Sequence, residues 1–184
     1  MGLRGFCYAG KVQEHVHVLK RILALAHALA LFLNCNLVSM KALIQRVSTA
    51  SVKIDGKTVG EIKHGLLVFL GVKNGDTEKD AEYLAGKIAN LRVFEGSGGH
   101  FDKSIIDEGK EVLVISQFTL YGSTKKGRRP DFSEAANPDY AENLYDYFVH
   151  KMRETGIKTE TGKFQEMMDV KSVNSGPVTF MVET

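Results

Sequence analysis

The sequence predicts a layered α/β domain in which mixed β-sheets are covered by two main helices. Three features of residues 40–184 predict this class. Strand-like segments come first and last, two stretches with helical spacing interrupt them, and two apolar runs fit strands buried on both faces. Because sheets and helices of this kind bury their apolar faces against one another, we expect a single domain with a layered core.

The first elements are strands. Residues 42–47 and 51–54 predict a strand with a bulge, and Asp55-Gly56 predicts a hairpin turn, because a type I′ turn needs positive φ angles. Residues 57–62 then return along the first strand. Residues 65–72 are continuously apolar, which is typical of a strand buried on both faces.

Two helices follow the pattern of apolar residues every three to four positions. We expect the first over residues 77–91, capped by Thr77, with its buried face formed by Ala81, Leu84, Ala85, Ile88 and Leu91. We expect the second over residues 138–154, with Asn137 as N-cap, Pro138 at the first position and Gly156 as the stop. Its buried face comprises Ala141, Leu144, Tyr145, Phe148 and Met152.

The remaining segments are a second buried strand, a glycine loop and the closing strands. Residues 112–115 predict the buried strand, which runs on into residues 116–120. The glycines at 96–99 predict a flexible loop, since no P-loop Lys-Ser/Thr follows them. Short strands are expected near residues 158–160, 167–172 and 177–182. Pro177 then requires an explanation, because proline cannot donate a hydrogen bond to a strand ladder.

Residues 1–39 differ from the rest of the chain. They hold both cysteines, Cys7 and Cys35, and carry four basic residues against one acidic residue. The apolar run at 22–33 is shorter than the roughly 20 residues that a membrane span needs. We interpret 1–39 as an N-terminal extension: a dispensable, disordered segment or a wrongly assigned start, with an organellar leader as the alternative. Residues 40–184 form the expected domain.

Composition excludes several kinds of chemistry in residues 40–184. This part has no cysteine, which excludes a disulfide framework, a thiol nucleophile and a cysteine zinc site, and favours a reducing, intracellular setting. Its histidines, His64, His100 and His150, lie in no HExxH motif, and no serine lies in a GxSxG motif. We therefore expect no metal, no cofactor and no Ser-His-Asp triad.

Two clusters remain as candidates for function. Ser116, Gln117 and Thr119 come where a buried strand ends, the usual place for ligand sites in layered α/β domains, although they could equally satisfy the backbone at the edge of the sheet. The basic run Lys125, Lys126, Arg128 and Arg129 is either a solvated loop or a contact for nucleic-acid phosphates. Both interpretations of each cluster stay open on the residues alone.

Four segments, in this order and spacing, resemble a known family. They are residues 40–47 (MKALIQRV), 116–120 (SQFTL), 126–130 (KGRRP) and 174–179 (NSGPVT). Together they are similar to the D-aminoacyl-tRNA deacylases, also called D-tyrosyl-tRNA deacylases, and the similarity covers residues 40–184. The resemblance implies the deacylase fold, with mixed, barrel-like β-sheets and two main helices. It also implies a cytoplasmic homodimer that hydrolyses the ester between a D-amino acid and tRNA.

The resemblance implies a role for each candidate residue. Ser116, Gln117, Phe118 and Thr119 would form the floor of the pocket. Gly176 and Pro177, joined by a cis peptide bond, would enter the partner's site and exclude L-amino acids. The resemblance further implies that substrate is bound or framed by Arg46, Phe164, Met168, Asn174 and Thr179, and tRNA by Lys125, Lys126, Arg128 and Arg129. Phe164 and Met168 could equally be core residues.

The implied mechanism uses the substrate's own ribose 2′-hydroxyl, while the protein orients the ester and stabilises the oxyanion. Glycine on tRNA is an expected further substrate. Two hypotheses compete with this one: a catalytically silent tRNA-binding module of the same fold, and a related deacylase with relaxed chirality. Two segments depart from the family pattern, residues 1–39 and the loop at residues 96–102.

Overall fold

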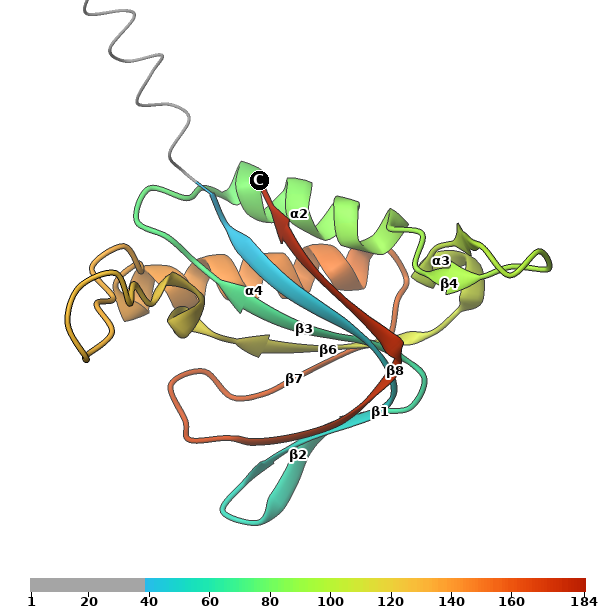
Figure 1. The fold of residues 1–184 in the computed structure, drawn as a ribbon, viewed down its shortest axis with the longest axis horizontal. Coiled ribbons are helices and arrows are strands. Elements are labelled where there is room, and N and C mark those ends of the chain that lie inside the picture. Colours follow the sequence, from blue (N-terminus) through green and yellow to red (C-terminus); the bar gives the residue numbers. More distant parts are fainter. Residues whose placement is uncertain (1–38) are drawn as a thin grey trace, which may run out of the picture. The chain divides into compact units, whose positions relative to one another are not determined.

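The computed structural model describes residues 39–184, so the predicted extension lies outside the described residues except for Ser39. The described part is built around β1 (Lys41–Ile54). Its first half pairs antiparallel with β3 (Gly65–Gly71), its second half with β2 (Lys57–Ile62), and its other edge with β8 (Asp169–Glu183). Figure 1 shows β8 running beside β1 along this length.

Parallel strands extend the sheet beyond β3. β6 (Glu111–Ser116) pairs with β3, and β7 (Thr159–Thr161) pairs with β6, which gives the order β2-β1-β3-β6-β7 with β8 on β1. The sheet curls until β2 approaches β7. A Cβ atom on Gly60 would lie only 2.6 Å from the Thr161 carbonyl oxygen. The predicted class, a mixed barrel-like sheet with two main helices, is confirmed.

The two main helices, α2 (Glu78–Asn90) and α4 (Pro138–Glu154), pack against each other and cover one face of the sheet (Figure 1). The side chains of β3 point alternately into two apolar cores, one on each face of the sheet. Leu66, Val68 and Leu70 face the helices, whereas Leu67 packs inside the curl with Leu113 and Ile115. A strand with an apolar core on each face needs apolar residues at every position. This explains the continuous apolar runs at residues 65–72 and 112–115, which were predicted to be strands buried on both faces.

Local signals in the sequence set the ends of these elements. Asp55 and Gly56 both have positive φ angles, as the predicted hairpin turn requires. The Asn137 side chain accepts a hydrogen bond from the Tyr140 amide at 3.0 Å and caps α4, and Gly156 follows the helix with a φ of 82°. Ala89 joins the buried face of α2 and Val149 that of α4, while Leu91 and Ala141 are only partly buried.

Three expectations need correction. The strand at residues 112–115 ends at Ser116, and the chain continues as the 3₁₀ helix η2 (Phe118–Tyr121). The two closing strands are one long strand, β8, whose middle departs from regular pairing. The glycine segment joins two strands, β4 (Phe94–Glu95) and β5 (Phe101–Lys103), which are followed by the one-turn helix α3 (Ile105–Glu108). These strands are too short for any alternation of apolar residues to reveal them.

Candidate active site

A cavity of about 790 Å³ opens where β3 and β6 end, beside the start of α4. Five of the residues singled out from the sequence line it, although they come from positions about 50 residues apart: Ser116, Gln117, Phe118, Phe164 and Met168. The other walls are mainly apolar. They include Leu70, Val72, Ile115, Phe132, Pro138 and Tyr145. Cavities that are mostly apolar with a few polar groups are typical of small-molecule sites.

The polar side of the cavity is formed by the turn that leaves β6. The Gln117 amide donates to the Leu70 carbonyl at 2.7 Å, so the backbone of the turn is fixed to the end of β3. The Gln117 side-chain amide donates to the Thr119 hydroxyl, the one hydrogen bond that the Thr119 side chain makes within residues 39–184. Thr119 is exposed and does not line the cavity wall. This partner can orient the hydroxyl but cannot take its proton, so the arrangement favours positioning over nucleophilic attack.

The inner wall is aromatic and fixed. The Tyr145 hydroxyl donates to the Val114 carbonyl at 2.9 Å, and burial raises the pKa of Tyr145 above its ordinary value, which keeps the hydroxyl protonated. Its ring packs against Phe164 with 5.8 Å between centroids. Gly162 allows Met168 to enter the site, because a Cβ atom there would lie 2.5 Å from the Met168 sulfur.

The rim carries large apolar side chains that remain accessible. Phe118 is 57% exposed and meets Phe132 edge-on, with 5.0 Å between ring centroids. Met167, which also lines the cavity, is 92% exposed. Aromatic faces of this kind can stack with a nucleic-acid base.

The Gly176-Pro177 segment lies elsewhere on the chain and does not line this cavity. In the β1–β8 register, Val47 faces Asn174 and Gln45 faces Thr179, so residues 175–178 bulge out opposite Arg46. The Asn174 side chain closes the bulge: its oxygen accepts from the Val178 amide at 2.9 Å, and its nitrogen donates to the Thr179 hydroxyl at 2.8 Å. The peptide bond before Pro177 is cis, and Gly176 has a φ of 127°.

Arg46 joins this bulge to the domain. Its Nε donates to the Ser175 carbonyl at 3.1 Å and its Nη1 to the Val93 carbonyl at 2.7 Å, while Nη2 lies 3.7 Å from a Glu95 carboxylate oxygen. The structure therefore brings Arg46, Asn174 and Thr179 together around residues 175–178. They form a second group, separate from the cavity within one chain.

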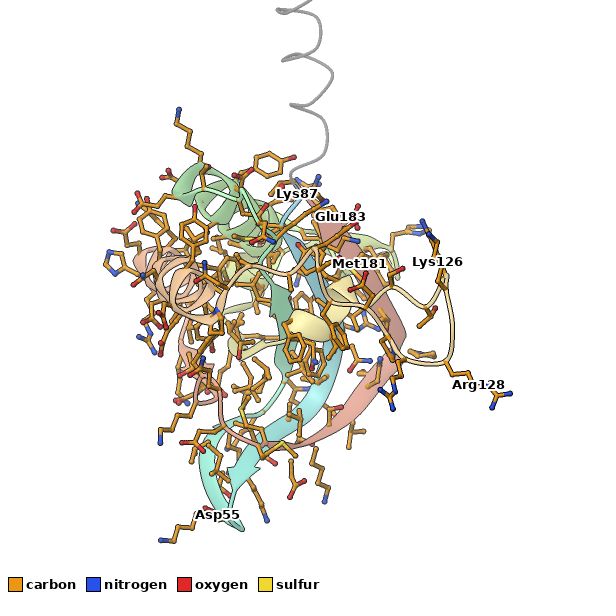
Figure 2. The ribbon with its side chains drawn as sticks, turned by 90° about the vertical axis from the view of Figure 1, so that its left-hand side faces the viewer. Asp55, Lys87, Lys126, Arg128, Met181 and Glu183 are labelled. Carbon is orange, nitrogen blue, oxygen red and sulfur yellow. The ribbon has the colours of Figure 1, made fainter. Side chains whose placement is uncertain are left out.

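The basic residues form a third group on an exposed loop. Backbone hydrogen bonds between Ser123 and Asp131, at 2.7 and 2.9 Å, close the base of the loop. Lys125, Lys126, Arg128 and Arg129 are exposed and make no ion pair with any residue in 39–184. Figure 2 shows Lys126 and Arg128 pointing away from the domain. Four unpaired cations on a closed loop are suited to contacts with phosphates.

The described part of the chain has neither a cluster of metal ligands nor a helix that could span a membrane. No three His, Cys, Asp or Glu side chains of residues 39–184 are grouped so as to hold a metal ion. None of the helices in this part has the length and apolar character to cross a membrane.

Sequence reasoning did not identify every residue at these sites. Phe132 was part of an unassigned loop and Tyr145 was identified only as a core residue, yet both line the cavity. Glu95 and Phe101 contact Arg46 from the β4–β5 hairpin, in which the sequence predicted only the flexible loop at residues 96–99. The spacing of residues along the chain holds no signal for these contacts, because Arg46 and Phe101 are brought together only by the fold.

The end of parallel strands is a common position for a ligand site in α/β folds, and the mixed, barrel-like fold with its apolar cavity belongs to this broad class; the fold alone does not identify the ligand. Comparison with known proteins identifies the family. The model of the family described as D-Tyr-tRNA(Tyr) deacylase matches residues 43–183. Proteins named D-aminoacyl-tRNA deacylase from Bacillus anthracis (strain CDC 684 / NRRL 3495) and Bacillus cereus (strain B4264) are each 54% identical over 145 residues, which are 79% of this chain and 99% of theirs. The chain therefore belongs to the D-Tyr-tRNA(Tyr) deacylase family, a family of hydrolases.

Two solved structures share the fold of this chain. The structure titled c-Myc DNA Unwinding Element Binding Protein superposes with a TM-score of 0.74 at 41% identity, over 78% of this chain and 98% of the other. A second, titled a probable eukaryotic D-amino acid tRNA deacylase, gives a TM-score of 0.70 over 79% and 100%. At 17% identity, the second supports the fold alone.

Proposed function

We propose that this protein hydrolyses the ester between a D-amino acid, or glycine, and the 3′ end of tRNA. The observation that carries the proposal is the cavity at the end of β6, lined by Ser116, Gln117 and Phe118, in a chain that is 54% identical to proteins named D-aminoacyl-tRNA deacylase. A mostly apolar cavity with polar groups on one side suits a terminal adenosine that carries an ester.

In the proposed reaction, water adds to the ester carbonyl carbon and the bond to the ribose oxygen breaks, which releases the free amino acid and tRNA. The ribose 2′-hydroxyl assists the proton transfers, and the protein orients the ester and stabilises the oxyanion. Gln117 and Thr119 act as positioning groups in this scheme, which agrees with the hydrogen bond between their side chains. Phe164 and Met168 shape the pocket.

Stereochemical selection is assigned to the carbonyls of Gly176 and Pro177, which would clash with an L side chain. Arg46, Asn174 and Thr179 hold this segment through the hydrogen bonds around residues 175–178. Because residues 176 and 177 do not line the cavity of their own chain, the proposal places them in the site of a second copy, in a homodimer. The basic loop binds the tRNA backbone, and the proposed location is the cytoplasm.

The test uses the full 184-residue chain and compares D-tyrosyl-, L-tyrosyl- and glycyl-tRNA. We expect release of D-tyrosine and glycine, with L-tyrosyl-tRNA spared. Gln117→Ala and Pro177→Ala should reduce D-tyrosine release, whereas Val59→Ala, at an exposed position on β2, should leave it unchanged. No release from D-tyrosyl-tRNA by the wild-type chain would refute the proposal.

The same measurements separate the competing functions. A silent tRNA-binding module, suggested by the four basic-loop cations that have no ion pair within residues 39–184, would bind tRNA in a salt-dependent manner and leave the ester intact. A deacylase of relaxed chirality would hydrolyse D- and L-tyrosyl-tRNA at equal rates.

A further inference from the structure

The guanidinium of Arg46 contacts the β4–β5 hairpin as well as the Gly-Pro bulge. Two of its three nitrogens, Nη1 and Nη2, are directed to Val93 and Glu95, and the ring of Phe101 lies 5.3 Å from its central carbon. Only Nε is directed to Ser175. The Arg46 side chain is only 12% exposed, and because it is largely shielded from water these few partners fix its position. A planar group held at all three nitrogens has little freedom to rotate.

The hairpin is itself a compact unit. The Gly96 amide donates to the His100 carbonyl at 3.1 Å, and the Val93 amide donates to the Lys103 carbonyl at 3.2 Å. Lys103 forms an ion pair of 2.8 Å with Glu108 of α3, which fixes the end of the hairpin to the domain. Glu95 and Phe101 therefore approach Arg46 from a supported position.

The contact between Arg46 and the bulge is close. A Cβ atom on Gly176 would lie 2.8 Å from Nη2 of Arg46, the same nitrogen that faces Glu95. Movement of the guanidinium away from the hairpin would therefore change both the hydrogen bond to Ser175 and the space beside Gly176. The hairpin and the bulge are connected through one rigid side chain.

We propose that Glu95 and Phe101 are positioning residues for stereochemical selection: they fix Arg46, which in turn fixes the backbone of residues 175–178. This inference rests on the proposed function, since selection is assigned to that segment. A backbone filter discriminates only if its carbonyls stay in place when an L side chain presses against them. Replacing Pro177 changes the segment that enters the partner's site, whereas loosening Arg46 leaves that segment in the site and only lets it yield. Loosening Arg46 should therefore admit L substrates and leave D substrates almost unaffected.

The experiment compares kcat/KM for D-tyrosyl- and L-tyrosyl-tRNA in the full-length protein and in Glu95→Gln, Phe101→Leu and the double variant. Gln keeps the shape of Glu95 without its charge, and Leu keeps an apolar side chain without the aromatic ring. We expect D-tyrosyl-tRNA turnover within about twofold of wild type. Turnover of L-tyrosyl-tRNA should rise about three- to tenfold in each single variant, and further in the double variant, as expected for loss of one exposed ion pair or cation–π contact.

Controls remove the same interactions at sites remote from Arg46. Tyr83→Leu removes the ring 5.4 Å from Lys87 on α2, together with a hydrogen bond from Lys87 to its hydroxyl. Glu154→Gln removes the charge that pairs with Lys151 and His150 on α4. Both variants should keep the wild-type ratio of the two rates. Phe101→Tyr should retain it as well. Hydrogen exchange of the Ser175, Gly176 and Val178 amides should be faster in Glu95→Gln and Phe101→Leu than in the controls; Pro177 has no amide proton.

Failure of this inference can be distinguished from failure of the proposed function. If the wild-type chain hydrolyses D-tyrosyl-tRNA selectively but folded Glu95→Gln keeps the wild-type ratio and exchange rates, this inference is wrong and the proposed function stands. If the wild-type chain hydrolyses neither substrate, the proposed function fails. Glu95 is 60% exposed, so its substitution decides the matter even where Phe101→Leu does not fold.

Discussion

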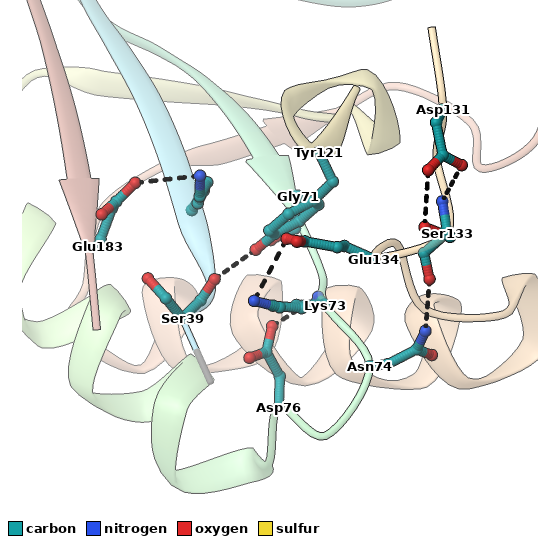
Figure 3. Close-up of polar contacts among 11 residues, drawn as sticks. Ser39, Gly71, Lys73, Asn74, Asp76, Tyr121, Asp131, Ser133, Glu134 and Glu183 are labelled. Carbon is teal, nitrogen blue, oxygen red and sulfur yellow. Dashed lines mark hydrogen bonds and ion pairs between the residues drawn. The ribbon is translucent and has the colours of Figure 1, made fainter. Parts of the chain in front are cut away.

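At the scale of single residues, Asp76 has the most unusual environment in the described part of the chain. It is fully buried, and one carboxylate oxygen accepts from the Lys73 amide at 2.7 Å while the other has no hydrogen-bond partner within residues 39–184. Figure 3 shows Asp76 beside Lys73, whose amino group pairs instead with Glu134. Burial raises the pKa of Asp76 to about 6, and the Lys73 hydrogen bond opposes this only in part.

This environment predicts how stability depends on pH. Between pH 4 and pH 6 the native state holds the Asp76 proton while the unfolded state has lost it, so the contribution of Asp76 to the free energy of unfolding falls as pH rises through this window. Asp76→Asn removes this contribution. We expect the free energy of unfolding of Asp76→Asn, relative to wild type, to increase from pH 4 to pH 7 by up to about 3 kcal/mol, measured by urea unfolding.

The control is Asp55→Asn, at an exposed turn residue with positive φ that asparagine also tolerates. This variant reports the pH dependence that comes with replacing an exposed aspartate. If the difference for Asp76→Asn changes with pH no more than the difference for Asp55→Asn, burial does not raise the pKa of Asp76.

At the scale of elements, the loop between Ser123 and Asp131 shows how a short segment can be specialised for one contact. Its base is closed by two backbone hydrogen bonds, and its tip holds four cations without ion pairs in residues 39–184. Elsewhere in the described domain, lysines are commonly paired with glutamates, as in Lys158 with Glu111. Unpaired cations keep their full capacity to replace counterions along a nucleic-acid backbone.

Neutralising this loop tests its role. Replacing Lys125, Lys126, Arg128 and Arg129 by Gln should weaken tRNA binding. It should also reduce the slope of log K against log salt by about 3, because each phosphate contact contributes about 0.7–0.9. Titrations at several salt concentrations measure both quantities. A matched variant neutralises four exposed lysines outside the loop, Lys53, Lys57, Lys79 and Lys171. Equal effects in the two variants would argue against a dedicated tRNA contact.

At the scale of the whole described domain, the cavity and the Gly-Pro bulge belong to different regions of one chain. β8 carries the bulge and pairs only with β1 among the described strands, so its other edge is unpaired. The exposed apolar side chains Val173, Phe180 and Met181 lie on this strand. An unpaired edge with apolar side chains is a surface that proteins usually cover, in agreement with the proposed homodimer.

Mixed dimers test whether the site is shared between chains. Gln117→Ala damages the cavity and Pro177→Ala the bulge, so each homodimer should have two impaired sites. A heterodimer of the two variants has one site that combines an intact cavity with an intact bulge, and we expect about half the wild-type turnover of D-tyrosyl-tRNA. Co-expression with two different tags isolates the heterodimer. If it is as inactive as the homodimers, the cavity does not use the partner's bulge.

The sequence by itself determined the two main helices, most of the strands and the candidate segments. The apolar runs, the helix caps and the Asp55-Gly56 turn are local signals, and the structure confirms the elements that they predicted. The four quoted segments identified the family because they preserve order and spacing along the chain, which needs no knowledge of the fold. The short hairpin β4–β5 escaped prediction, since its two strands have only two and three residues.

Only the tertiary structure decided which residues lie together. Packing brought Phe164 and Met168 to Ser116 in one cavity, and left Gly176 and Pro177 outside it. It directed Arg46 toward Ser175, 129 positions away in the sequence, and toward Glu95 and Phe101. It buried Asp76, which looks like an ordinary loop residue in the sequence. Contacts such as these depend on how the strands are ordered and curled, and a pattern that repeats every two or four residues carries no information about that order.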